Sequence, residues 1–179
     1  MPLINKKRYL EIFTFPVKEY YRQVGFSFGK ESFDTLAHEY IEYYQYNAKK
    51  SRLHKGVKKI LQIFKNDKIS QYILSAQKQS TLIEQVRQRE ILKYFKAIIG
   101  PNNIYAYDKT GIGLLFFQKM GINPLNTLLI GDTIHDWETA RTLDCHCVLI
   151  ANGHQSYARL KKTGAVVMKN LYDLLNISN

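Results

Sequence analysis

The stretch TLLIGDTIHDWETA, residues 127–140, is the most informative part of the chain for the fold class. An apolar run at 127–130 ends in Gly131 and Asp132, and Asp136 follows four residues later. The run has the length of a buried strand, and DWETARTLD at 136–144 has the pattern of a helix. Two carboxylates at the carboxyl end of a strand indicate a site for a hard cation, and Mg²⁺ suits such oxygen ligands better than zinc or copper.

Helix and strand patterns alternate on both sides of this stretch, from about residue 53 onward. The expected helices are GVKKILQIFKND (56–67), TLIEQVRQREILKYF (81–95) and GIGLLFFQKMGI (111–122). The expected strands are QYILSA (71–76), NIYAY (103–107), CVLIAN (147–152) and AVVM (165–168). Strands separated by helices in this rhythm predict an α/β fold with a parallel sheet covered on both faces.

The first 52 residues carry only helical patterns. RYLEIF (8–13), PVKEYYRQVG (16–25) and SFDTLAHEYIEYYQYN (32–47) place apolar residues at three- and four-residue spacing. We therefore expect a small helical unit over residues 1–52 and an α/β core over residues 53–179.

Polar residues at the predicted strand ends form a candidate site. Ser75 ends the first strand, Lys109 follows the second by two residues, and Asp132 ends the third. Ligands bind at the carboxyl ends of parallel strands, where these residues would share one edge. Ser75 could donate to a phosphoryl oxygen, and Lys109 could neutralise developing charge. Helix capping by Asp132 or Asp136, a turn role for Ser75 and a surface role for Lys109 are the alternatives.

These residues also carry a resemblance to a known family. LSA (74–76), YDKTGIG (107–113) and LLIGDTIHDWETA (128–140) resemble the second, third and fourth motifs of the haloacid-dehalogenase-like hydrolases. CVLIANGHQSYARL (147–160) and EIFTFPVKEYY (11–21) are similar to segments of the phosphoglycolate-phosphatase-like branch. The resemblance covers nearly the whole chain.

The resemblance implies a Rossmann-like three-layer core with a small N-terminal helical cap. It implies Mg²⁺-dependent hydrolysis of a small phosphorylated metabolite through an aspartyl-phosphate intermediate. Ser75 matches the residue that holds the phosphoryl group, and Lys109 matches the residue that balances its charge. Asp132 matches a Mg²⁺ ligand, and Asp136 matches the second acidic residue of that motif, which supports the metal or the lysine.

One motif of the family does not occur in the 179 residues. The family places its nucleophile in a DxDx[TV] motif at the end of the first strand. SFDTL (32–36) is the nearest match, but it has one aspartate and lies in a helical pattern, so Asp34 is not expected to be the nucleophile. The missing strand, its loop and a helix would amount to roughly 20 to 30 residues.

In the family that strand lies between the strands that carry Ser75 and Asp132. Its loss is expected to leave a gap of two strand spacings, about 10 Å, or two unpaired edges. We therefore expect an N-terminally shortened chain that is inactive as written. A non-catalytic protein that keeps an anion pocket at Ser75 and Lys109 is the alternative.

Composition limits the other classes of function. The net charge is +11, with a mild cluster of basic residues between Lys49 and Lys68. This cluster has no binding signature of regularly interleaved glycines or aromatic residues, so nucleic acid is not the expected partner. No apolar stretch reaches the ~20 residues of a membrane span, and the start MPLINKK does not match a signal peptide. The two cysteines are too close together for a disulfide framework, which favours a cytoplasmic location.

Two short motifs have structural readings. CHC (145–147) places both cysteines on one strand face without a partner pair, which favours packing over metal binding. GHQ (153–155) follows a strand end, so His154 could reach the edge of the site, but a loop histidine without function is the simpler expectation.

Overall fold

A computed structural model describes residues 4–28, 33–102 and 109–176. Its helices are α1 (Lys6–Ile12), α2 (Val17–Gln23), α3 (Phe33–Ala48), α4 (Val57–Asn66), α5 (Gln79–Gln88), α6 (Lys109–Met120), α7 (Ile134–Thr142) and α8 (Tyr157–Lys161). Its strands are β1 (Tyr72–Leu74), β2 (Ala97–Ile99), β3 (Leu128–Gly131), β4 (His146–Ile150) and β5 (Val166–Met168). Short 3-10 turns are η1 (Leu92–Tyr94), η2 (Pro124–Asn126) and η3 (Leu171–Asn176). Over the described residues, every helix is too short or too polar to cross a membrane.

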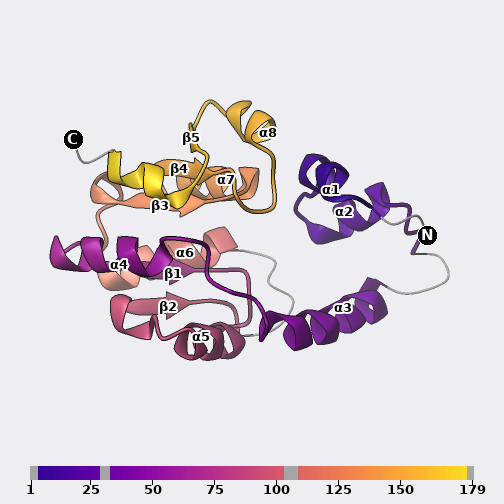
Figure 1. Ribbon diagram of the computed structural model, residues 1–179, viewed down its shortest axis with the longest axis horizontal. Helices are drawn as coiled ribbons and strands as arrows, with labels where there is room; N and C mark the ends of the chain where they lie inside the picture. The colour runs from indigo at the N-terminus through magenta and orange to yellow at the C-terminus, as the bar shows by residue number, and fades with distance from the viewer. Residues whose placement is uncertain (1–3, 29–32, 103–108, 177–179) are drawn as a thin grey trace.

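The strands form two parallel sheets rather than one. β1 pairs with β2, and β3–β4–β5 form the second sheet in that order. Within the described residues, β1 and β3 each have one free edge. Figure 1 shows β1 and β3 as the neighbouring strands of the two sheets. The parallel α/β fold is confirmed, and the split between β1 and β3 lies where the sequence analysis expected a gap or unpaired edges.

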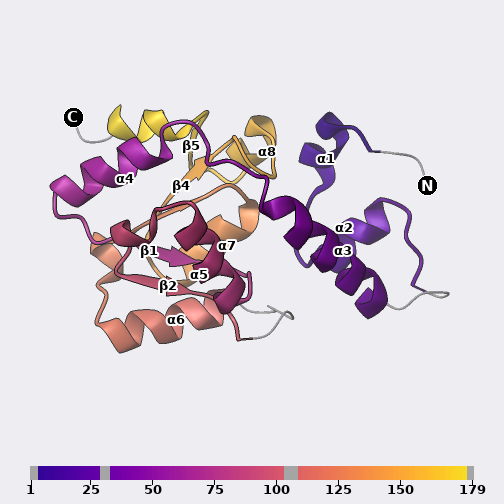
Figure 2. The same ribbon diagram turned by 60° about the horizontal axis from the view of Figure 1, so that its bottom comes forward.

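Two helices hold the sheets together from opposite faces. On one face, α4 packs Ile60 against the cluster of Val148 and Ile150, and Leu61 against the cluster that includes Ile73. On the other face, Gly113 of α6 lies between Leu74 of β1 and Leu143 at the end of α7. Figure 2 shows α4 and α6 on opposite sides of β1. The two sheets therefore share their covering layers although no hydrogen bond joins their strands in the described residues.

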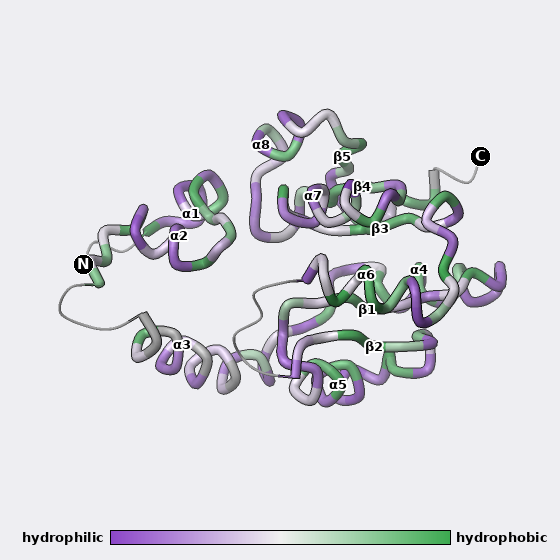
Figure 3. The backbone as a smooth tube through the Cα atoms, turned by 180° about the vertical axis from the view of Figure 1, so that it is seen from behind, coloured by the Kyte–Doolittle hydropathy of each residue, from purple (hydrophilic) through white to green (hydrophobic). Residues whose placement is uncertain are grey.

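Besides the cluster of Ile60, Val148 and Ile150, the described residues form two further apolar clusters. The largest fully buried side chains, Leu149 and Leu160, pack with Val167 beneath α7 and α8. Leu82, Val86 and Ile91 form a second cluster under the first sheet. Figure 3 shows the hydrophobic segments concentrated in the strands and in the helix segments next to them. This burial fixes the carboxyl ends of β1 and β3, and thus the position of the candidate site.

Several element boundaries differ from the sequence expectations. The helix expected at 81–95 ends at Gln88, because Glu90 adopts a left-handed backbone conformation with φ 59° and the chain continues into η1. β2 was not expected. The strand expected at 103–107 lies outside the described residues. In the sheet of β3, β4 and β5, each strand lies within the expected segments to within about a residue.

The N-terminal helices form a group beside the α/β part, as Figure 1 shows for α1, α2 and α3. Residues 4–28 and 33–48 are helical or irregular, in agreement with the helical patterns of the sequence. Aromatic rings pack within this group, including Tyr9 on Tyr20 and Phe13 on Phe15. Polar contacts from the loop after β4 reach back to it, as described below.

Candidate active site

The turn from β3 into α7 holds the carboxylate of Asp136. Thr133 is the N-cap of α7, and Asp136 occupies the third helical position in a reciprocal capping box. Its Oδ2 accepts hydrogen bonds from the backbone N of Asp132 at 3.0 Å, from the backbone N of Thr133 at 3.0 Å and from the Thr133 hydroxyl at 2.7 Å. The capping alternative is therefore realised for Asp136, and Thr133 is a site residue that the sequence analysis missed.

The other oxygen of Asp136 binds Lys109. The Lys109 ammonium donates to Oδ1 in an ion pair whose side chains are only 13% and 10% exposed. Burial alone would raise the pKa of Asp136, but the Lys109 charge and the hydrogen bonds from Lys109, Thr133 and the Asp132 backbone lower it below its usual value. Lys109 begins α6, so this ion pair joins α6 to α7 at the carboxyl end of β3.

Two glycines allow the close approaches on which this geometry depends. A Cβ at Gly131 would overlap the Cβ and carboxylate of Asp136. A Cβ at Gly153 would overlap the carboxylate of Asp132. Any larger residue at either position would push an aspartate out of place, which explains a Gly at the end of β3 and another after β4.

Asp132 is held at one oxygen only. Its Oδ2 accepts a hydrogen bond from the backbone N of His154 at 2.7 Å. No other donor reaches the Asp132 carboxylate from the part of the chain that the structure describes. Within the described residues, its Oδ1 is thus the carboxylate oxygen of the β3–α7 turn that has no donor.

Ser75 lies just past β1, on the other sheet. Its backbone N donates to Ile99 at 2.9 Å, which continues the pairing of β1 with β2. Its hydroxyl oxygen accepts from the backbone N of Gln77 at 3.1 Å, so the hydroxyl hydrogen is free to donate elsewhere. Ser75 and Asp132 follow strands that run in the same sense in Figure 1, with the free edges of β1 and β3 between them.

The loop after β4 connects this site to the helical unit. The His154 ring stacks on Phe13 with centroids 4.6 Å apart and bonds the Tyr9 hydroxyl. Gln155 is 2% exposed, accepts from the backbone N of Ile134 at 2.8 Å and donates to the Phe13 carbonyl at 2.9 Å. The sequence pattern gave no signal for Gln155, because its two partners are distant along the chain.

The structure brings together three of the four predicted site residues. Asp132, Asp136 and Lys109 form one hydrogen-bonded unit, and Ser75, which follows β1 of the other sheet, makes no hydrogen bond to them within the described residues. Among the described residues, no group of three or more His, Cys, Asp or Glu side chains could hold a metal ion. The metal role of Asp132 and Asp136 therefore stays a prediction.

The cysteines are not part of the hydrogen-bonded unit of this site, although Cys147 lies near enough for the charges of Asp136 and Lys109 to act on its pKa. Cys145 and Cys147 are free thiols, and Cys147 packs against the cluster of Leu149 and Leu160. Burial raises the pKa of the Cys147 thiol to about 12. An un-ionised thiol in an apolar cluster agrees with the packing interpretation.

Comparison with known proteins places the chain in a family. Residues 1–150 match the family model described as haloacid dehalogenase-like hydrolase. The sequence is 23% identical over 149 residues to phosphoglycolate phosphatase 1 of Pseudomonas aeruginosa. The match covers 82% of this chain and 55% of that protein, so the chain spans about half the length of this relative.

Solved structures show the same fold. A haloacid dehalogenase-like family hydrolase from Streptococcus pneumoniae superimposes with a TM-score of 0.79 at 20% identity, over 92% of this chain and 77% of that one. Protein tyrosine kinase A of Mycobacterium tuberculosis also has a TM-score of 0.79, at 16% identity, over 99% of this chain and 82% of that one. Because these two proteins carry names of different activities, the shared fold does not by itself assign a reaction. The match over residues 1–150, together with the β3–α7 turn and its lysine, shows that the chain belongs to the haloacid dehalogenase-like hydrolases.

Proposed function

We propose that this protein contributes the phosphate- and metal-facing side of a phosphomonoester hydrolase site. The observation that carries the proposal is the largely buried ion pair of Lys109 and Asp136, hydrogen-bonded to the backbone of Asp132 at the carboxyl end of β3. The name of the Pseudomonas relative supports a small phosphorylated metabolite as the substrate. The residues then have distinct roles, which follow from their hydrogen bonds.

Asp136 is assigned a positioning role in this proposal. Three donors occupy its Oδ2 and Lys109 occupies its Oδ1, so direct metal ligation would require these bonds to break. The pair holds the Lys109 ammonium at the strand end, where its remaining hydrogens can bind phosphoryl oxygens as negative charge develops. A buried setting strengthens this interaction relative to water.

Asp132 is the proposed metal ligand. Its available Oδ1 suits Mg²⁺, which takes one or two carboxylates and completes its coordination with water and phosphate oxygens. Mg²⁺ bound there would polarise the phosphoryl group and offset its charge. Ser75 would donate its free hydroxyl hydrogen to the same group from the end of β1.

The nucleophile is proposed to come from a further parallel strand outside these 179 residues. The free edges of β1 and β3 and the absence of any DxDx[TV] motif in the sequence support this idea. A strand between them would pair with both edges and end beside Ser75 and Asp132. By itself the chain is then proposed to lack turnover, with residues 1–52 serving as the cap over the core.

The test is an assay with an aryl phosphate and Mg²⁺. We expect no hydrolysis by the 179-residue chain, and hydrolysis after an apolar strand ending in DxDx[TV] is fused ahead of residue 1. In the fused protein, Asp132→Asn should abolish turnover, and Glu138→Gln, an exposed carboxylate on α7, should leave it unchanged. Activity that survives Asp132→Asn would refute the metal assignment.

A non-catalytic protein that binds phosphate is the second candidate. It is favoured by the lack of a three-residue metal cluster within the described ranges. It predicts that phosphate binding depends on Ser75 and Lys109 while the fused protein stays inactive. Turnover by the fused protein separates the two candidates, and calorimetric titration with inorganic phosphate, with and without Ser75→Ala, tests the anion pocket that the second one requires.

A further inference from the structure

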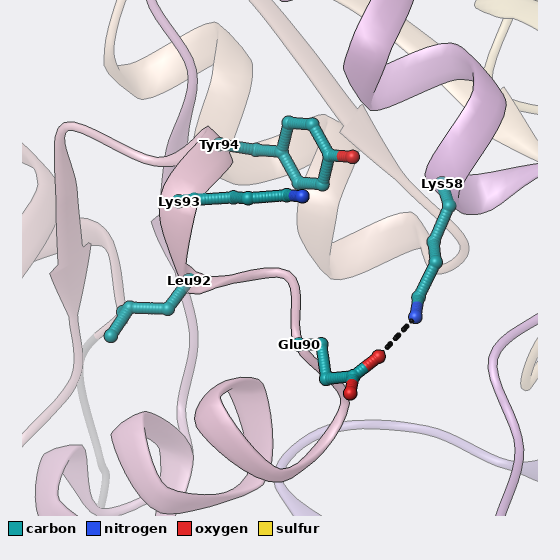
Figure 4. A pocket seen from close by; sticks show the side chains of 5 residues that line it. All are labelled: Lys58, Glu90, Leu92, Lys93 and Tyr94. Carbon is teal, nitrogen blue, oxygen red and sulfur yellow. Dashed lines mark hydrogen bonds and ion pairs between the residues drawn. The ribbon is translucent and has the colours of Figure 1, made fainter.

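A cluster of lysines lies between α4 and η1, away from the candidate active site. It surrounds a surface pocket of about 640 Å³ lined by Lys58, Glu90, Leu92, Lys93 and Tyr94. Figure 4 shows Lys93 and Tyr94 side by side, with Lys58 reaching in from α4 toward Glu90 and Leu92 turned away from both. The pocket is of a size that suits a small ligand.

Two lysines share the ring of Tyr94: Lys93 of the pocket lining, and Lys65 of α4, which lies outside that lining. The ammonium of Lys93 lies 5.3 Å from the centroid of the Tyr94 ring, and that of Lys65 lies 5.8 Å from it. The Lys65 ammonium also lies 3.4 Å from the Lys93 carbonyl. Because the ring and the carbonyl attract cations, they offset part of the repulsion between the two ammonium groups.

Glu90 is the single carboxylate of the pocket lining. It pairs with Lys58 at 2.9 Å, with side chains 82% and 52% exposed. Such an exposed pair is weak and opens at little cost in free energy. Neither Lys65 nor Lys93 has a carboxylate within ion-pair distance in the described parts of the chain. Three ammonium groups therefore face one carboxylate, which leaves a local excess of two positive charges.

The surrounding sequence adds to this positive field. The segment from Lys49 to Lys68, which includes α4, has many basic residues against one acid, Asp67. In sequence this segment lacks aromatic residues beyond Phe64, but the fold brings Tyr94 of η1 against its lysines. A field of this sign raises the local concentration of anions.

We propose that the pocket between α4 and η1 is a binding site for a phosphate-bearing small ligand, distinct from the candidate active site. A dianionic phosphoryl group matches the excess of two charges, and lysine ammonium groups are common phosphate ligands. The ligand displaces the Glu90 carboxylate from Lys58 and bridges Lys58 to Lys65 and Lys93. Since lysines already lie near the Tyr94 ring, recognition is by phosphate rather than by a stacked base.

The test uses the whole chain with inorganic pyrophosphate as the probe and amide NMR as the readout. We expect saturable shifts at the amides of Lys58 and of residues 91–95. Binding at the candidate active site would instead shift amides near Ser75 and Lys109, so the two sites are distinguished. The double variant Lys65→Met, Lys93→Met should lower the affinity at least about tenfold. The matched control Lys68→Met, Lys119→Met removes the same charge outside the pocket and should change it less than about twofold. Melting curves check that each variant is folded.

Glu90→Gln gives an opposite and more diagnostic result. Because Glu90 competes with the ligand for Lys58, its neutralisation should tighten pyrophosphate binding about two- to fivefold. Weaker binding by Glu90→Gln, or equal losses in the pocket and control doubles, would overturn the proposal. ADP should bind within about threefold of pyrophosphate, and a much higher affinity for ADP or for a single-stranded oligonucleotide would overturn recognition by phosphate alone.

Discussion

Asp136 shows how a single carboxylate can cap a helix and hold a cation at once. The residue is 7% exposed, and each of its carboxylate oxygens has its own partners. Its helix-capping bonds align the carboxylate, and this alignment places the Lys109 ammonium at the end of β3. Capping and charge placement are therefore one arrangement rather than competing interpretations of the same residue.

Removal of this carboxylate should be strongly destabilising. Asp136→Ala deletes the capping box and leaves the buried Lys109 ammonium unpaired, so we expect the free energy of unfolding to fall by roughly 3 to 5 kcal/mol. Urea denaturation measures this change. Glu138→Ala on the same helix, whose side chain is 59% exposed, should change it by less than about 0.5 kcal/mol. Equal losses in the two variants would contradict the assigned role.

The same carboxylate predicts a pH dependence. The folded-state pKa of Asp136 lies below its unfolded value of about 3.9. Its contribution to stability is thus fully present above about pH 4 and is lost as the pH falls through the folded pKa. The difference in urea midpoint between the wild type and Asp136→Asn should be large at pH 7 and should shrink on going from pH 4 to pH 2. A difference that is constant over this range would refute the ionic role.

At the scale of the elements, three helices end without the glycine that usually marks a helix end. Lys68, Glu90 and Asp144 have φ values of 59°, 59° and 55° after α4, α5 and α7. In each case the next residue donates its backbone N back to the helix, as Ile69 does to Phe64 at 2.8 Å. These are Schellman ends in which a residue with a Cβ holds a left-handed conformation, at some cost in free energy.

Relief of that cost should stabilise the protein. Lys68→Gly keeps the left-handed turn and removes the steric penalty of a Cβ, so we expect a gain of about 0.5 to 1 kcal/mol in the free energy of unfolding. Chemical denaturation measures the gain. Lys59→Gly, within α4, should instead lose about 1 kcal/mol. A loss in both variants would show that the left-handed position is not strained.

At the scale of the whole molecule, the α/β part is held together by its helices. It is tied to the N-terminal unit by polar contacts and by ring contacts such as that of His154 with Phe13. α4 and α6 bridge the two sheets through Leu61 and Gly113. Gln155 joins the start of α7 to the Phe13 carbonyl, which also accepts from Arg159 at 2.5 Å. Burial lowers the pKa of the Arg159 guanidinium. The position of α1 beside the site thus depends on few residues.

Loss of the Gln155 side chain should loosen this connection. Gln155→Ala leaves the backbone N of Ile134 and one bond of the Phe13 carbonyl unsatisfied in a buried place, so we expect a loss of about 2 kcal/mol. Hydrogen exchange should accelerate at the amides of α1 more than at those of β4. Gln118→Ala, on the exposed side of α6, serves as the control. Unchanged exchange in α1 would contradict the anchoring role.

Much of the local structure was predictable from the sequence. The apolar runs of β3, β4 and β5 and the amphipathic pattern of α4 indicated their elements, because both depend on side chains a few residues apart. The end of α5 was missed because Glu90 occupies a position where glycine is the usual signal. β2 was missed because AII at 97–99 is a run of only three apolar residues, although Gly100 and Pro101 follow it directly.

The sequence by itself determined the α/β rhythm, the helical character of the first 52 residues and the candidates Ser75, Lys109, Asp132 and Asp136. Only the tertiary structure decided which of them meet. Lys109 and Asp136 are 27 residues apart along the chain, and Gln155 and Phe13 are 142 apart. Such contacts depend on how separate elements pack, and periodicity in a single chain carries no information about that packing. The family resemblance led us to expect a gap between the strands of Ser75 and Asp132, but only the structure showed that α4 and α6 pack against both sides of it.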